Sequence, residues 1–549
     1  MLTTSRQFDA ALRIVAQLRA SGHEAYLAGG CVRDLLLGRE PKDYDVATSA
    51  TPDVVLNMFP RTFAVGARFG VVLVATCAGA GGVFDAESDG SESPFTDAVE
   101  ARLTPPQVVT EVATFRSDGA YSDGRHPDGV QYTTSAEEDV RRRDFTINGM
   151  LLDVDRLFPS GLKPGSLTDL NIGAKARTLQ SKMHTPGVEQ SAENIIQNGT
   201  KRQGTTLVVP QLQPEESGAL APEECSSTVS LQNLRASIID HVNGLSDLEA
   251  GVVRAIGRPE LRFEEDHLRM LRGVRFAARF GFELEAGTAL AIRSLAPKVA
   301  AVSRERVRDE LTKMLTEGHA RQAFELLDST GLLAEVLPEV ARMKGVEQPP
   351  QFHPEGDVWR HTLLVLGQLE EGCSLTLAWG ALLHDVGKPP TFRRAERIRF
   401  DGHVEVGAAM AAEICRRFRF SNDEIRQILA LVENHMRFMD AHRMKASTLK
   451  RFFRLENFPE HLALHRMDCL ASHGNLDNWG FVRERYEAIP EEAVRPRPLV
   501  TGRELIAAGY KPGPRFQQML CAVEDAQLEG TIETEAEALT LILERFPVA

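Results

Sequence analysis

The sequence of 549 residues predicts an α+β fold, in which a head of mixed strands and helices precedes a long helical region. Two observations predict it. Residues 1–153 alternate short apolar strand patterns with helical patterns. From Arg262 onward, apolar residues recur almost everywhere at helical spacing. The expected helices there are 264–280, 304–317, 319–331, 358–370, 375–385, 403–417 and 421–435.

The segment YLAGGCVRDLLLGREPKDYDVAT predicts a strand, a glycine turn, a helix and a second strand. Gly29 and Gly30 leave room for a ligand at the backbone, and the free N–H groups of the helix start favour a phosphate. We expect a strand over 42–46, in which Asp43 and Asp45 point to the same side. Two neighbouring carboxylates repel each other unless a divalent cation lies between them. The segment therefore predicts a nucleoside triphosphate held with Mg²⁺.

This segment resembles the active-site motif of the DNA polymerase β nucleotidyltransferase superfamily. It resembles more closely the class II tRNA nucleotidyltransferases and bacterial poly(A) polymerases. The resemblance implies a polymerase β-like head followed by an all-α neck and body, with nucleotide contacts from Gly29, Gly30 and Arg33. It also implies a third catalytic carboxylate on a neighbouring strand, for which Glu111 is our candidate. Two Mg²⁺ ions would then promote attack of an RNA 3′-hydroxyl on the α-phosphate.

A second motif, RRRDFTINGM, begins at Arg141. Arginine suits phosphate because its planar fork bonds two oxygens at once. The motif is similar to the RRDFTIN-A-M of the same family, with Gly149 in place of alanine. The resemblance implies nucleotide contacts from Arg143, Asp144 and Asn148.

A third motif, EEDHLRMLRGVRF, places Asp266, Arg269 and Arg272 three residues apart. On one helix face this spacing allows either an ion-pair ladder or a carboxylate and a guanidinium that read a base. The string resembles the family's nucleotide-selecting motif. The resemblance implies that Asp266 and Arg269 read the base, while Arg272 and Arg275 support phosphates or backbone.

The C-terminal half contains an ordered set of imidazoles and carboxylates: His361, His384, Asp385, His403, His435 and Asp468. Such ligands suit Mn²⁺, Ni²⁺, Fe or Mg²⁺. The string HDVGK resembles the HD-domain metal phosphohydrolases, in which H…HD…D binds metal, and the two added histidines would allow a second metal ion. Some tRNA nucleotidyltransferases carry such a domain with phosphatase and 2′,3′-cyclic phosphodiesterase activity.

Composition marks two insertions. A loop at about 78–104 is rich in Gly, Ser and acidic residues, and residues 154–237 are rich in Ser, Gln, Gly, Pro and Thr. The longer segment has too few apolar residues to offset its ordering entropy, so we expect disorder there, in place of a hairpin turn between strands 151–153 and 238–240. The expected domains are the head (1–153), the hinge and neck (238–335), the HD domain (336–475) and a helical tail (476–549).

Bulk properties narrow the class of protein. A net charge of −14 is unusual for an RNA-binding enzyme, but RNA responds to local basic patches rather than to the average. The sequence contains no run of about 18 apolar residues, so we expect no membrane-spanning helix. The seven cysteines are scattered without a CxxC pair, which is typical of a reduced cytoplasm.

The motifs together predict that the protein adds CCA to tRNA from CTP and ATP and carries an HD phosphohydrolase. The string AVGARFG resembles the CCA-adding type, and the segment 115–130 resembles the flexible loop needed to add the terminal A. One alternative is a poly(A) polymerase, or a partial enzyme that adds only A or only CC, although the loop at 115–130 argues against CC-only addition. Another is an HD phosphohydrolase with a vestigial RNA-binding head, which the intact head motifs disfavour.

Overall fold

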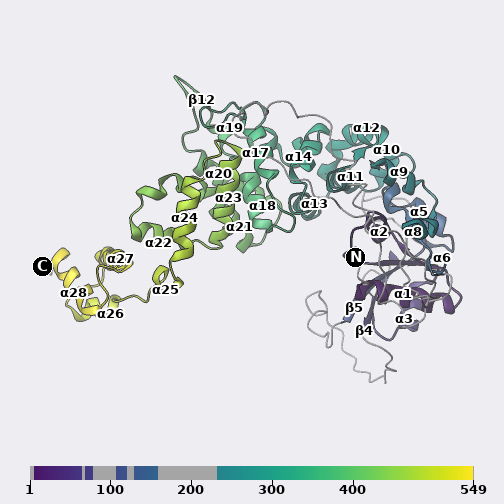
Figure 1. Ribbon diagram of the computed structural model, residues 1–549, viewed down its shortest axis with the longest axis horizontal. Coiled ribbons are helices and arrows are strands. Elements are labelled where there is room, and N and C mark those ends of the chain that lie inside the picture. Colours follow the sequence, from purple (N-terminus) through teal and green to yellow (C-terminus); the bar gives the residue numbers. More distant parts are fainter. Residues whose placement is uncertain (1–4, 65–68, 78–106, 120–128, 159–230, 548–549) are drawn as a thin grey trace, which may run out of the picture. The chain divides into compact units, whose positions relative to one another are not determined.

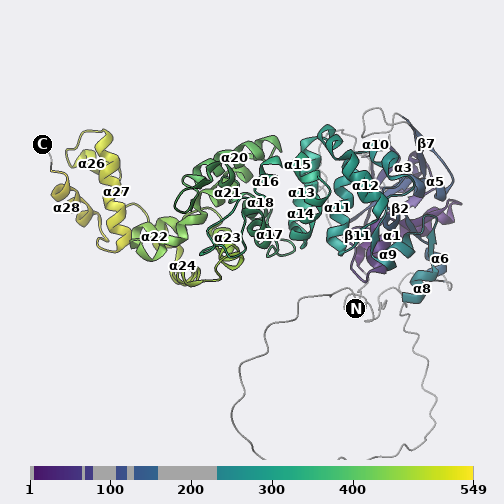
Figure 2. The ribbon, with the colours of Figure 1, turned by 90° about the horizontal axis from the view of Figure 1, so that it is seen from above.

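The computed structural model describes residues 5–64, 69–77, 107–119, 129–158 and 231–547 (Figures 1 and 2). The chain divides into two compact units. Unit 1 comprises residues 1–118 and 130–245, and unit 2 comprises residues 119–129 and 246–549. The insertion at 78–104, most of 154–237 and the middle parts of the predicted 64–70 and 115–130 motifs lie outside the described residues.

Unit 1 is built on a seven-stranded sheet in the order β3-β4-β5-β2-β1-β8-β9. The strands are β1 (Ala25–Ala28), β2 (Asp45–Thr48), β3 (Thr62–Phe63), β4 (Val71–Cys77), β5 (Gln107–Thr114), β8 (Met150–Leu152) and β9 (Ile238–Asp240). Strands β2 and β5 are parallel, and the other neighbours are antiparallel. The mixed sheet confirms the predicted head architecture. A separate pair joins β6 (Arg116–Asp118) to β7 (Val130–Tyr132).

The helices of unit 1 are α1 (Arg6–Ala20), α2 (Gly30–Leu36), α3 (Pro52–Met58), α5 (Ala136–Arg141), the short 3₁₀ helix η2 (Thr146–Asn148), α6 (Val154–Leu157) and α8 (Leu231–Ala236). Ser5 begins α1 by accepting a hydrogen bond from the backbone N–H of Phe8. The apolar face of α1, with Leu12, Ile14 and Leu18 fully buried, packs against β1 and β5. This packing makes α1 part of the core under the sheet.

The structure corrects the predicted strand over 42–46. Strand β2 begins only at Asp45, and Asp43 lies in the loop before it. The reason is the short partner strand: β1 ends at Ala28, which pairs with Asp45, because the chain then turns at Gly29 into α2. The two aspartates therefore do not lie on one face of a strand.

The predicted hairpin across the long insertion is confirmed by the pairing of β8 with β9, in which Met150 faces Asp240 and Leu152 faces Ile238. Helices α6 and α8 lie inside the range 154–237 and contact each other. Ordered structure therefore extends farther into both ends of this range than its composition indicated.

The described residues of unit 2 form helices apart from short strand pairs. Its helices are α9 (Gly244–Ala250, at the boundary), α10 (Pro259–Glu265), α11 (Leu268–Phe280), α12 (Ala286–Leu295), α13 (Arg304–Thr316), α14 (Ala320–Ser329), α15 (Leu332–Val336), α16 (Pro338–Ala341), α17 (Val358–Leu366), α18 (Leu375–Leu383), α19 (Lys388–Thr391), α20 (His403–Arg417), α21 (Asn422–Asn434), α22 (Ala446–Phe453), α23 (Phe458–Ala471), α24 (Asp477–Ala488), α25 (Glu491–Val494), α26 (Gly502–Ala507), α27 (Pro514–Glu529) and α28 (Glu535–Arg545), with 3₁₀ helices η5 (Ala296–Ala301) and η6 (His435–Arg443). Most predicted helices are confirmed to within a few residues.

The predicted helix over 264–280 is wrong at its start. Residue Asp266 has an extended backbone, with φ −148° and ψ 106°, and separates α10 from α11. Its Oδ1 accepts a hydrogen bond from the N–H of Leu268 at 3.0 Å, which stabilises the start of α11. The Asp266 side chain competes for backbone N–H groups and so interrupts the helix, although the apolar periodicity continues across this position.

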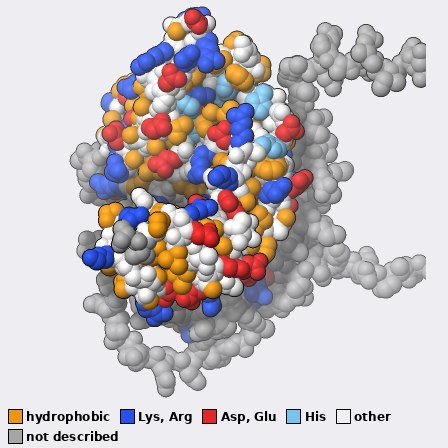
Figure 3. Space-filling model, turned by 90° about the vertical axis from the view of Figure 1, so that its left-hand side faces the viewer, with side chains coloured by type: hydrophobic (Ala, Val, Ile, Leu, Met, Phe, Trp, Pro, Cys, Tyr) orange, Lys and Arg blue, Asp and Glu red, His pale blue; other side chains and the backbone are white. Residues whose placement is uncertain are grey.

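Buried contacts in unit 2 join helices distant in sequence. Helix α18, with Trp379 fully buried, packs against α13, α17, α21 and α23. Farther along, Arg451 on α22 forms ion pairs with Glu524 and Asp525 on α27. No described helix is long and apolar enough to cross a membrane. On the face drawn in Figure 3, basic and acidic side chains are interspersed.

Candidate active sites

Three carboxylates meet in unit 1. Asp45 begins β2, and the pairing of Val46 with Val112 places Asp45 beside Glu111 on β5. Burial raises the pKa of Asp45 to about 6, and repulsion from Glu111 and from Asp43 adds to the rise. Desolvation of the Glu111 carboxyl, and then the charge of Asp43, raise the pKa of Glu111 as well. Carboxylates that destabilise each other's charge form a donor set suited to a divalent cation.

A glycine turn and an arginine face these carboxylates. Gly29 precedes α2 with φ 76°, and a Cβ there would lie 3.0 Å from Nη1 of Arg143. The guanidinium of Arg143 lowers the pKa of both Asp45 and Glu111, against the larger effects that raise them. Gly29 therefore supplies both the backbone conformation and the space that Arg143 occupies.

The remaining predicted nucleotide residues of unit 1 form one polar network. Arg33 is buried in an ion pair with Asp34 at 2.7 Å and donates to the side chain of Asn148. Nδ2 of Asn148 donates to Oδ1 of Asp144 at 3.1 Å, and the same oxygen accepts from the N–H of Phe145 at 2.8 Å. The network fixes the backbone that follows the RRRDF string.

Asp139 is a buried residue that the sequence interpretation missed. It is 1% exposed and accepts from Nη2 of Arg143 at 3.0 Å and from Nε of Arg142 at 2.9 Å. Burial opposes its charge, but Arg143 and then Arg142 outweigh this effect and lower its pKa. Its position three and four residues before these arginines on α5 was the signal that could have revealed it.

The predicted base-reading residues lie at the break between α10 and α11. Oδ2 of Asp266 accepts from Nη2 of Arg306 on α13 at 2.7 Å, while Nη1 of Arg269 contacts Glu265 and the carbonyl of Arg262. The two side chains are therefore held by different partners rather than by a shared ladder.

Arg272 and Arg275 were expected to support phosphates or backbone. The guanidinium of Arg272 lies 5.3 Å from the ring centre of Phe276. Arg275 is 6% exposed and pairs with Glu310 at 2.7 Å and Glu317 at 3.5 Å. Burial in this ion pair makes Arg275 a link between α11 and α13, and its expected support of phosphates or backbone stays a prediction.

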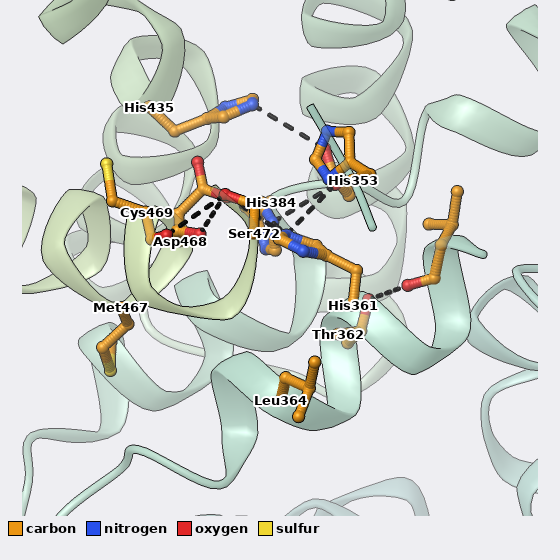
Figure 4. Close-up of polar contacts among 12 residues, drawn as sticks. His353, His361, Thr362, Leu364, His384, His435, Met467, Asp468, Cys469 and Ser472 are labelled. Carbon is orange, nitrogen blue, oxygen red and sulfur yellow. Dashed lines mark hydrogen bonds and ion pairs between the residues drawn. The ribbon is translucent and has the colours of Figure 1, made fainter. Parts of the chain in front are cut away.

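The six predicted metal ligands converge in unit 2, and Figure 4 labels four of them, His361, His384, His435 and Asp468. They come from α17 (His361), the end of α18 (His384 and Asp385), the start of α20 (His403), the start of η6 (His435) and α23 (Asp468). Nε2 of His361 lies 3.1 Å from Oδ1 of Asp468 and 3.3 Å from Nε2 of His384. Nε2 of both His403 and His435 lies within 4 Å of Oδ1 of Asp385, at 3.9 and 3.8 Å.

Backbone carbonyls orient three of these rings. Nδ1 of His384, His403 and His435 lies 2.8, 3.0 and 2.6 Å from the carbonyl oxygens of residues 381, 400 and 432. Because Nδ1 donates its proton there, Nε2 is the nitrogen left to bind a metal. In His403 and His435 this atom is buried and has no hydrogen-bond partner. Burial also lowers the pKa of His435 to about 4, which favours the neutral ligand form.

The ligands form two groups that share Asp385. One contains His361 and His384, and the other contains His403 and His435. The buried, unpartnered nitrogen atoms and the mixed donor set fit one or two divalent cations. Gly387 allows this arrangement, because a Cβ there would lie 2.1 Å from the carbonyl oxygen of His403.

Three further side chains at this centre were not predicted. Nζ of Lys388 lies 2.7 Å from Oδ2 of Asp385 and donates to Oε1 of Gln348 at 2.7 Å. The carboxylate of Glu355 lies 2.8 Å from Nδ1 of His361. Lys388 is the last residue of the HDVGK string, so the sequence could have indicated it. Gln348 and Glu355 lie in a loop without a periodic sequence pattern, so no signal in the sequence indicated them.

Three models of known domain families match this chain. Residues 25–183 match the poly(A) polymerase head domain, residues 281–344 match the probable RNA and SrmB-binding site of polymerase A, and residues 358–492 match the HD domain. The chain is 36% identical over 320 residues to a CC-adding tRNA nucleotidyltransferase of Thermus thermophilus, covering 55% of this chain and 72% of that protein.

Other relatives cover nearly the full length. A CCA-adding enzyme of Lactobacillus johnsonii is 27% identical and covers 97% of this chain and 96% of its own. The crystal structure of the Bacillus stearothermophilus CCA-adding enzyme in complex with CTP has the same fold, with a TM-score of 0.61, 23% identity and 98% of each chain covered.

The mixed sheet with its glycine turn and three carboxylates, joined to a helical region with an HD centre, defines a nucleotidyltransferase with a poly(A) polymerase-type head. The chain belongs to the tRNA nucleotidyltransferase family.

Proposed function

We propose that this tRNA nucleotidyltransferase adds CCA to the 3′ end of tRNA from CTP and ATP. The observation that carries the proposal is the meeting of Asp45 and Glu111 on parallel strands, with Asp43 and Arg143 beside them. Full-length CCA-adding relatives, and solved relatives described with CTP and with ATP, support this choice of substrates.

The site residues of unit 1 have different roles in nucleotidyl transfer. The turn at Gly29 leaves space for the triphosphate, and Arg143 supplies a fixed positive charge next to the carboxylates. Asp43, Asp45 and Glu111 would hold Mg²⁺, which when bound activates the RNA 3′-hydroxyl and stabilises the leaving pyrophosphate.

We assign base selection to Asp266 and Arg269 on their resemblance to the family motif. A carboxylate accepts from the exocyclic amine that both cytosine and adenine carry, and a guanidinium donates to ring acceptors. The pairing of Asp266 with Arg306 orients this carboxylate at the break between α10 and α11.

The test is nucleotide incorporation on tRNA lacking CCA, tRNA ending in CC, and an unstructured oligo(A). Ordered addition of C, C and A, confined to the tRNAs, is expected. Asp45→Asn should lower the rate more than roughly a thousandfold, because metal binding supplies several kcal/mol of transition-state stabilisation. Asp53→Asn, at an exposed position on α3, is the control. Addition of A to the CC-ending tRNA alone would contradict CCA addition and indicate an A-adding enzyme. Long A tails on any RNA would indicate a poly(A) polymerase instead.

A second activity, hydrolysis of RNA-terminal phosphates at the HD centre, is favoured by the two ligand groups that share Asp385. Mn²⁺, Ni²⁺, Fe or Mg²⁺ bound there would activate a water molecule. Lys388 places a positive charge beside this aspartate. Asp385→Asn should abolish hydrolysis of 2′,3′-cyclic and 2′-phosphate ends and leave CCA addition intact; hydrolysis that survives the substitution would refute this activity.

A further inference from the structure

One imidazole of the HD centre is held differently from the other three. The Nδ1 atoms of His384, His403 and His435 contact backbone carbonyls, whereas Nδ1 of His361 lies 2.8 Å from Oε1 of Glu355. Glu355 lies in the loop before α17, six residues before His361 in the sequence. Among these four rings, His361 is the one supported by a carboxylate.

The Glu355 carboxylate is itself firmly fixed. Its side chain is 5% exposed, and the same Oε1 lies 2.8 Å from Nδ1 of His353. The rings of His353 and His361 meet edge to face, with centroids 5.0 Å apart (Figure 4). Two imidazoles therefore position Oε1 of the carboxylate, while Oε2 is buried without a hydrogen-bond partner.

A carboxylate and a carbonyl have different effects on a ligand. A carboxylate that accepts the Nδ1 proton stabilises the positive charge that a metal induces on the ring, and so makes Nε2 a stronger donor. Nε2 of His361 faces Asp468 and His384 at 3.1 and 3.3 Å. The carboxylate therefore strengthens a metal ligand in the group that contains His361. In the other group, the Nδ1 atoms of His403 and His435 contact backbone carbonyl oxygens only.

We propose that Glu355 is a positioning residue that makes the two metal positions of the HD centre unequal. The position built from His361, His384, Asp385 and Asp468 binds a divalent cation more tightly and fills first. The position built from Asp385, His403 and His435 fills second. This inference rests on the metal centre of the proposed HD activity and adds to it an order of loading.

The test uses full-length protein freed of metal and titrated with Co²⁺ in excess Mg²⁺. Magnesium occupies the carboxylates of unit 1, whereas Co²⁺ prefers imidazole and reports its ligands by visible absorption. Calorimetry measures both binding steps. Glu355→Gln keeps the shape and removes the charge, so the dissociation constant of the tighter step should rise roughly 10–100-fold while the weaker step is unchanged. The spectrum of the first equivalent should change with it.

Two variants complete the experiment. Glu347→Gln is the matched control, because this glutamate lies in the same loop, has a 56% exposed side chain and pairs with Arg394; it should leave both steps unchanged. Glu355→Asp retains the charge on a shorter side chain and should weaken the tighter step alone, by less than glutamine does. It also serves as the test variant if Glu355→Gln does not fold.

The outcomes separate the two proposals. An unchanged tighter step, equal weakening of both steps, or weakening of the weaker step would overturn the role of Glu355 while leaving the metal centre in place. Absence of Co²⁺ binding to the unsubstituted protein, both with and without Mg²⁺, would refute the metal centre and this inference together. Equal melting temperatures of the metal-free proteins establish that a loss of affinity does not reflect unfolding.

Discussion

Single residues in this protein act through buried charges that have several partners. Asp139 holds two arginines, Asp385 is approached by Lys388 and the imidazoles, and Arg275 is neutralised by glutamates. A buried charge that loses one partner is destabilised far more than an exposed one. A conservative substitution at such a residue keeps the size of the side chain and removes its charge. It therefore tests whether the charge orients the partner residues.

Asp139→Asn should impair nucleotide addition although Asp139 is not one of the three carboxylates Asp43, Asp45 and Glu111. The amide cannot hold both arginine forks, so Arg143 loses its fixed position and kcat/KM should fall roughly 10–100-fold, chiefly through KM for the nucleotide. Steady-state kinetics with CTP and ATP measure it. Glu137→Gln, whose partner Arg141 is exposed, is the control. A kcat/KM equal to that of the control would contradict the positioning role.

His461 should make the stability of unit 2 depend on pH. Burial lowers its pKa from 6.5 to about 4, so the folded state favours the neutral ring. Its contribution is complete above about pH 6.5 and is lost as pH falls towards 4, because protons then bind the unfolded chain more readily. The loss amounts to about 3 kcal/mol.

Urea unfolding at several pH values tests this dependence, followed by the fluorescence of Trp359, Trp379 and Trp479. All three tryptophans of the chain lie in unit 2. His461→Gln should reduce the slope of the profile between pH 6.5 and 4, to which His435 and His465 also contribute, and His473→Gln, at an exposed position, is the comparison. Parallel profiles for both variants would argue against the assignment.

At the scale of elements, close approaches and breaks position the sites. The short strand β1 ends the ladder at Asp45, and the break at Asp266 gives this aspartate an extended backbone from which it pairs with Arg306 on α13. The start of α20 lies against α19 at Gly387, and this contact brings His403 towards Asp385.

Gly387→Ala should separate these two helices. The added Cβ would lie 2.1 Å from the carbonyl oxygen of His403 and 2.5 Å from the nitrogen of Gly407, both of which belong to backbone. Overpacking of this kind costs about 1–3 kcal/mol or more and should also weaken metal binding at His403. Gly480→Ala on α24 has open space around it and should be neutral or stabilising by about 0.5–1 kcal/mol. Urea unfolding followed by tryptophan fluorescence measures both, and equal stability of the two variants would disprove the close contact.

At the scale of the whole molecule, the two units contain two kinds of candidate metal centre. The centre of unit 1 consists of carboxylates, and that of unit 2 is rich in imidazoles. A net charge of −14 does not prevent RNA binding by local groups. Both signs of charge are mixed over the face seen in Figure 3.

Chelation should therefore affect the two units unequally. A cation bound to the native HD centre at a hundred times its dissociation constant stabilises that unit by about 2.7 kcal/mol, and removal by a chelator cancels the gain. Hydrogen exchange should accelerate in peptides from α17, α20 and α21 and stay unchanged in β1, β2 and β5. Uniform acceleration across both units, or none, would contradict a structural contribution of the HD metal.

Much of this organisation was accessible from the sequence, because it depends on local patterns. Short segments of the sequence predict the glycine turn, the helix lengths and the HDVGK string with its candidate ligands. The spacing of the segment at 43–45 also indicates that Asp45 has a carboxylate neighbour, Asp43. The family resemblance added Glu111, which the structure brings beside Asp45 on β5.

Other features were decided only by the tertiary structure, because they depend on residues distant in sequence. Strand β2 starts at Asp45 because its partner strand ends, and Arg275 is buried because Glu310 on α13 neutralises it. Glu355 reaches His361 from a loop without periodicity. Local sequence thus determined which groups are present, and packing between distant elements determined which of them are available for chemistry and which support the others.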